Sequence, residues 1–98
     1  MNSPYNVCMT KTIWTDKWQS EVFDRLYRIV ELPFIPFIGL EIQNLNGFNC
    51  DPIEHVAWNG ETQVFYASTR AEVGDEERSA DDIRHWSLSN GWLSQKKK

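Results

Sequence analysis

The sequence is poor in the residues that build metal, redox and disulfide sites. It has two cysteines, Cys8 and Cys50, and two histidines, His55 and His85, among 98 residues. Two cysteines are too few for a disulfide scaffold, and they are not spaced as a C-x-x-C pair. We therefore expect two reduced thiols in a cytoplasmic protein, without a metal or other cofactor.

The chain also lacks a long apolar run and an excess of basic residues. It has no apolar stretch of about 18 residues and no apolar run behind a basic start, so the sequence predicts neither a membrane span nor a secretory signal. Acidic residues number 14 and basic residues 10, and three of the basic residues are Lys96, Lys97 and Lys98. Because nucleic-acid binding depends on basic groups, this balance argues against DNA or RNA as a partner.

The length allows one hydrophobic core. We expect residues 1–98 to form a single α+β domain, with an irregular N-terminus at about residues 1–12 and a flexible basic tail at 94–98. The predicted fold is a small antiparallel sheet of three to four strands. Two helices pack on it, one near residues 16–30 and one near 79–91.

The first helix is predicted from apolar residues at steps of three and four in DKWQSEVFDRLYRIV. Asp16 is its expected N-cap, and Trp18 is expected to face the core. The same residues also fit a strand that ends near Leu32, because Phe23 and Tyr27 would then share one face. This alternative stays open.

The stretch LPFIPFIGLEI, residues 32–42, cannot be a helix interior, since Pro33 and Pro36 lack a backbone N–H. It predicts a strand packed on the core at a sheet edge. Ile35 and Phe37 fall on its second face, which two helices on one side of a sheet would leave uncovered.

A hairpin is predicted for residues 53–68, because two β-prone runs flank Asn59-Gly60. That dipeptide favours a two-residue type I′ turn. With this turn His55 and Tyr66 share one face of the hairpin, whereas Trp58 faces Glu61 on the other.

The acidic segment 72–82 leads into the second predicted helix. Ser79 is a typical N-cap with Asp82 three residues later, and Asn90-Gly91 predicts the C-terminal stop. Trp86 is expected on the core side of this helix.

No catalytic group or metal site is predicted. Cys50, Asp51, His55 and His85 are single residues on different predicted elements, and their spacing does not match a metal site. Cys50 and His55 are close in sequence, but the neighbouring acids oppose a reactive thiolate. The chain is thus more typical of a non-enzymatic protein.

Self-association is the favoured functional hypothesis. The sequence contains more apolar surface than two helices can cover, and this surplus predicts a homo-oligomer, most simply a dimer. The expected interface residues are Ile35, Phe37, Val56, Trp58 and Phe65.

Two further hypotheses remain open. A small-molecule pocket for a cationic or aromatic ligand, or a small enzyme based on His55, would use His55, Trp58, Tyr66 and Glu54. An acidic inhibitor or antitoxin-like protein, of the kind found on mobile elements, would bind a basic protein partner through segment 72–82.

Overall fold

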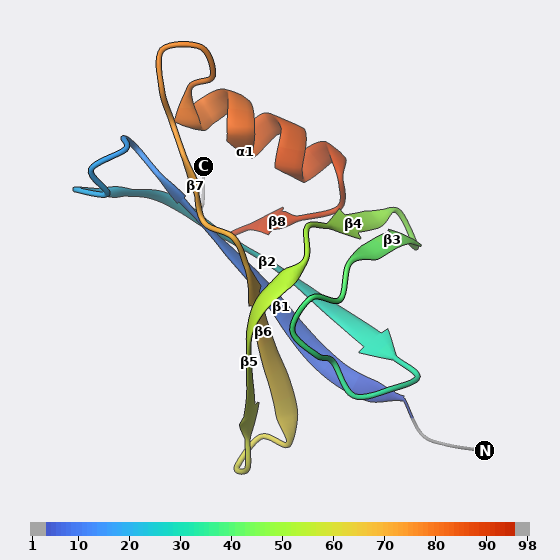
Figure 1. Ribbon diagram of the computed structural model, residues 1–98. Helices are drawn as coiled ribbons and strands as arrows, with labels where there is room; N and C mark the ends of the chain where they lie inside the picture. The colour runs from blue at the N-terminus through green and yellow to red at the C-terminus, as the bar shows by residue number, and fades with distance from the viewer. Residues whose placement is uncertain (1–3, 96–98) are drawn as a thin grey trace.

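The structure is a computed structural model that describes residues 4–95. Within this range the chain forms eight strands and one helix (Figure 1). In chain order these are β1 (Tyr5–Trp14), β2 (Val22–Leu32), β3 (Ile42–Leu45), β4 (Phe48–Cys50), β5 (Ile53–Asn59), β6 (Val64–Thr69), β7 (Glu72–Val73), α1 (Ala80–Ser89) and β8 (Leu93–Ser94).

One mixed sheet dominates the fold, in the order β5-β6-β1-β2-β8, with β7 also paired to β1. β1 is antiparallel to β2 and parallel to β6 and β7. Figure 1 shows β1 and β2 as a long ribbon through the molecule, with α1 on one side. The predicted α+β fold of two helices on a small antiparallel sheet is therefore wrong, because the chain is mostly β with one short helix.

β1 is the central strand, although the sequence predicts irregular structure up to about residue 12. Its alternate residues Val7, Met9, Lys11 and Ile13 are buried on one face of the sheet, called the inner face below. This is the period of two that a strand requires. The lysine interrupts the apolar alternation, which is why hydropathy alone does not indicate the strand.

Residues 16–30 form a turn and most of β2 in place of the predicted helix. Asp24 and Leu26 are buried on the inner face and pair with β1, so the strand alternative is confirmed. Asp16 caps a tight turn instead of a helix. The Oδ1 of Asp16 accepts the N–H of Trp18 at 3.0 Å. Pairing along β1 decides the structure over the local helix pattern.

The strand predicted for residues 32–42 is also wrong, except at its two end residues, which belong to β2 and β3. Residues 33–41 form a loop, and a strand resumes only at Ile42. Pro33 and Pro36 cannot donate to a ladder, and Gly39 has a φ of 94°. The chain therefore turns where an extended strand was expected.

The hairpin of β5 and β6 is present, but its turn differs from the prediction. Residues 60–63 form a four-residue loop instead of a two-residue turn. Asn59 accounts for the difference, since its Oδ1 accepts the N–H groups of Glu61 and Thr62 at 2.9 and 3.2 Å. An asparagine bonded in this way stabilises a wider turn than type I′.

The longer loop changes the register of the hairpin, but it does not change which side chains lie on which face. Trp58 lies opposite Phe65 rather than opposite Glu61. Because the loop is longer by an even number of residues, side chains beyond the irregularity at the start of β5 keep their predicted faces. Val56 thus faces the inner side with Trp58, and His55 faces the outer side.

The second predicted helix is confirmed as α1. Its capping box is complete: the hydroxyl of Ser79 accepts the N–H of Asp82 at 3.1 Å, and the Asp82 carboxylate accepts the N–H of Ser79 at 3.3 Å. The helix ends before Gly91, whose φ is 93°. A Cβ at this position would lie 2.8 Å from the Cα of Phe48, so only glycine fits.

Two buried charges on the inner face bind α1 and its flanks to the ribbon. Asp24 accepts the guanidinium Nε of Arg84 at 2.8 Å and the hydroxyl of Ser94 at 2.6 Å. The Nζ of Lys11 donates to Ser87 at 2.7 Å and to Glu72 at 3.0 Å. Both charges are paired, which removes the large cost of burying them alone.

Asp24→Ala should lower the free energy of unfolding by about 3 kcal/mol, because it leaves the Arg84 guanidinium without its partner. Asp81→Ala is the control, since its ion pair with His85 is exposed, and should cost less than about 0.5 kcal/mol. Urea unfolding followed by tryptophan fluorescence measures both. Equal stability of the two variants would show that the buried pair does not hold the helix.

Candidate functional site

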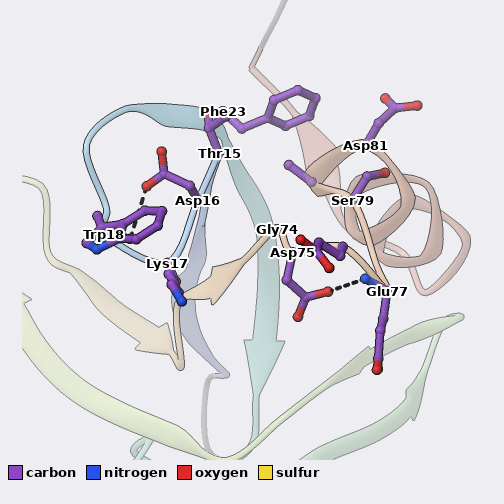
Figure 2. A pocket seen from close by; sticks show the side chains of 12 residues that line it. Thr15, Asp16, Lys17, Trp18, Phe23, Gly74, Asp75, Glu77, Ser79 and Asp81 are labelled. Atoms are coloured by element: carbon purple, nitrogen blue, oxygen red, sulfur yellow. Dashed lines mark hydrogen bonds between the residues drawn. The ribbon is translucent and has the colours of Figure 1, made fainter.

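An open groove lies where the turn between β1 and β2 approaches the segment that enters α1 (Figure 2). Its volume is about 960 Å³. The turn, β2 and the segment from β7 into the helix supply its lining: Thr15, Asp16, Lys17, Trp18, Phe23, Gly74, Asp75, Glu76, Glu77, Ser79, Ala80 and Asp81. Below, it is called the acidic groove.

Asp16 shapes the turn on one side of the groove. Its carboxylate accepts the Ser20 hydroxyl at 2.8 Å and the backbone N–H of Trp18 at 3.0 Å. These bonds hold the turn compact and leave Trp18 with 76% of its surface exposed, although the sequence predicts this residue in the core. The ammonium of Lys17 lies 4.8 Å from the centre of the Trp18 ring.

The loop on the other side is fixed by Gly74 and Asp75. The N–H of Gly74 donates to the carbonyl of Trp14 at 3.0 Å, and a Cβ on Gly74 would lie 2.6 Å from the backbone nitrogen of Ala80. Asp75 accepts the N–H of Glu77 at 2.9 Å, a bond drawn in Figure 2. The loop therefore packs tightly on the helix start, with Asp75 bonded to the loop's own backbone and Glu76 and Glu77 exposed.

The groove has a strongly negative lining. Its lining includes one lysine and five acidic residues, Asp16, Asp75, Glu76, Glu77 and Asp81. Within residues 4–95, the side chains of Glu76 and Glu77 have no ion-pair partner. These acids therefore remain available to an external cation.

Basic residues near the groove are engaged elsewhere. Arg78 pairs with Glu72 at 3.5 Å and lies over the Trp86 ring, with 5.4 Å between the guanidinium carbon and the ring centre. Arg84 is held by Asp24 on the inner face. Trp86 is half exposed, so its predicted core position is wrong as well.

The acidic residues of the predicted segment 72–82 thus have different roles. Glu72 neutralises the buried Lys11, and Asp82 caps α1. The acids between them line the groove. Sequence reasoning located this half of the site, but missed the half formed by residues 15–23, because those residues were interpreted as a helix with a buried tryptophan.

The predicted ligand-binding residues do not come together. His55 and Tyr66 lie on the outer face, Trp58 lies on the inner face, and Glu54 is exposed at the bulge of β5. None of them lines the acidic groove or a smaller cavity of about 270 Å³ beside Lys11. The pocket hypothesis remains a prediction without a supporting cavity.

The predicted interface residues lie away from the groove. Val56 and Phe65 pack partly against the core, whereas Ile35, Phe37 and Trp58 are each more than half exposed. Phe65 lies on the same face as Trp58, and their ring centres are 6.5 Å apart. This surface is separate from the acidic one.

The cysteines lie in environments that suppress thiolate formation. Cys50 is buried in β4, and this burial raises the pKa of its thiol; the nearby Asp51 and Glu41 carboxylates raise it further. Burial also raises the pKa of the Cys8 thiol. His55 makes no hydrogen bond to Cys50 within the described residues.

Comparisons with known proteins find no matching family model, no similar curated protein and no similar solved structure. Among residues 4–95, no three His, Cys, Asp or Glu side chains are arranged to hold a metal ion. No helix in the same range is long and apolar enough to cross a membrane.

Cys50 should resist alkylation by iodoacetamide in the folded protein at neutral pH, because its raised pKa keeps the thiol protonated. It should react fully once urea unfolds the chain. Mass spectrometry with peptide mapping distinguishes the two cysteines. Rapid labelling of Cys50 in the native state would contradict this account.

Asp16 should titrate below the ordinary aspartate range, since bonds from Ser20, chiefly from its hydroxyl, lower the pKa of its carboxyl. The turn is therefore stabilised above the pKa of the unfolded chain and loses this contribution as pH falls through the lower folded value. Ser20→Ala should raise the pKa of Asp16. Carboxyl carbon shifts in an NMR pH titration measure both values; an unchanged pKa in the variant would contradict the assignment.

Proposed function

We propose that this protein is a non-enzymatic interaction protein whose acidic groove binds a basic, extended segment of a partner protein. One observation carries the proposal: the groove combines five carboxylates with two aromatic side chains, those of Trp18 and Phe23. This is the role of an acidic inhibitor or antitoxin-like partner. It rests on surface chemistry rather than on a reactive group, because the lining contains no cysteine or histidine.

Arginine suits this surface better than lysine does. A guanidinium stacks on an aromatic face and pairs with a carboxylate through two parallel hydrogen bonds. Trp18 already has a cation above its ring, from Lys17. An incoming arginine would displace this weakly held lysine and pair with a carboxylate of the groove lining.

Charge also favours fast capture of such a segment. The groove concentrates negative charge on a chain whose net charge is −4. A charged cleft of one sign raises the association rate of an oppositely charged partner, and salt screens this effect over about 8–10 Å. Binding should therefore weaken as the salt concentration rises.

A fluorescein-labelled octa-arginine peptide tests the proposal by fluorescence anisotropy. The double variant Glu76→Lys/Glu77→Lys should weaken its binding about tenfold, the scale expected when two exposed charge contacts become repulsive. Trp18→Ser should weaken octa-arginine more than octa-lysine, because stacking favours guanidinium.

The matched control is Glu54→Lys/Glu61→Lys, which makes the same charge change at exposed sites on the β5–β6 hairpin. It should retain most of the affinity. Equal losses of affinity in the two double variants would mean that peptide binding depends only on the net charge of the protein, and would overturn the proposal. A chain that ends at Gln95 removes Lys96–Lys98, which lie outside the described residues, as competitors for the groove.

A further inference from the structure

A second surface lies at the other end of the β1–β2 ribbon from the turn that lines the acidic groove. Large apolar side chains are exposed here, with exposed fractions between 37% and 69%. We call this surface the apolar end, and its members are Tyr5, Phe34, Ile35, Phe37, Ile38 and Trp58.

Ring contacts join the aromatic members of the apolar end in two groups, Tyr5 with Trp58 through Phe65 and Phe34 with Phe37. The rings of Tyr5 and Trp58 both contact Phe65, with centres 6.1 and 6.5 Å from its ring. Tyr5 also lies opposite Leu32 in the sheet, directly before the loop that carries the other members. In that loop the N–H of Gly39 donates to the carbonyl of Ile53 at 2.8 Å, which fixes the loop beside β5.

Residues 4–95 leave much of the apolar surface of this loop uncovered. Ile35 and Phe37 remain 54% and 53% exposed after the fold has formed. Residues 32–40 contain no charged residue, and Pro33 and Pro36 remove two backbone donors. A partner on this surface would therefore meet it mainly through apolar side chains.

The exposed apolar area is large enough for a small dimer interface. Aromatic side chains each offer about 150–250 Å² when fully exposed, so the apolar end presents roughly 600 Å². Two copies would bury about 1,200 Å² in total, the lower bound for specific stable interfaces. Glu31 and Glu41 flank the uncharged residues 32–40 in the sequence, and charged residues of this kind are typical of interface margins.

We propose that the apolar end is a self-association surface, on which a second copy of this chain packs about a two-fold axis. An apolar patch is complementary to itself, and a two-fold axis brings the same residues together from both copies. The uncharged loop is also where two acidic chains can meet with the least repulsion. This inference is independent of the proposed peptide binding, and it leaves both acidic grooves at the outer ends of the dimer.

Analytical ultracentrifugation of the full chain tests the association at about 50 μM, since interfaces of this size can be as weak as micromolar. The wild type should sediment as a dimer. Ile38→Glu, and independently Trp58→Lys on a different element, should each produce a monomer. Both positions are exposed, so circular dichroism should show that each variant keeps the wild-type fold.

Ile29→Glu is the matched control, because Ile29 is as exposed as Ile38, at 64% against 69%, but lies on the outer face. It should remain a dimer. Higher salt should strengthen the dimer, since it screens repulsion between acidic copies, in contrast to its effect on peptide binding. A monomeric wild type, or dissociation by Ile29→Glu without dissociation by Ile38→Glu, would overturn the proposal.

Discussion

The buried ion pair between Asp24 and Arg84 is the constraint on which the arrangement of this protein depends. It joins the central ribbon to the only helix within residues 4–95, over a distance of 2.8 Å between charged groups. Lys11 adds a second charged connection through Ser87. The start of α1 is then placed beside the turn between β1 and β2, and the acidic groove is the space between them. The geometry of the groove therefore depends on buried charges that do not line it.

The ribbon separates two surfaces of opposite character. One end carries the acidic residues that line the groove, and the other carries the uncharged residues 33–40. In the two proposed complexes, electrostatic attraction would act at the first end and burial of apolar area at the second, so salt should affect the two in opposite directions. A dimer formed through the apolar end would display two acidic grooves. A partner with two basic segments would then gain affinity from simultaneous engagement.

Local signals in the sequence predicted those parts of the structure that local bonds stabilise. Ser79 and Asp82 indicated the helix start, and the Asn-Gly dipeptide at residue 59 indicated the hairpin. The faces of that hairpin were predicted despite the wrong turn, because an even change in loop length preserves them. Strand β2 was mistaken for a helix because its partner strand was not recognised. In β1, the buried Lys11 interrupts the alternation of apolar residues that would have indicated a strand. The sequence predicted a partner-binding acidic segment 72–82 but no groove, because Trp18 joins these acids only through the β1–β2 pairing.

Amide shift mapping by NMR, with unlabelled octa-arginine added to the labelled protein, locates the peptide-binding surface residue by residue. The largest shift changes should fall on residues 15–23 and 74–81, which flank the groove from two separate parts of the chain. Small changes are expected for the outer-face residues His55 and Tyr66, which share the sheet but not the site. Shift changes centred on the outer face, or spread evenly over all exposed acids, would contradict binding in the acidic groove.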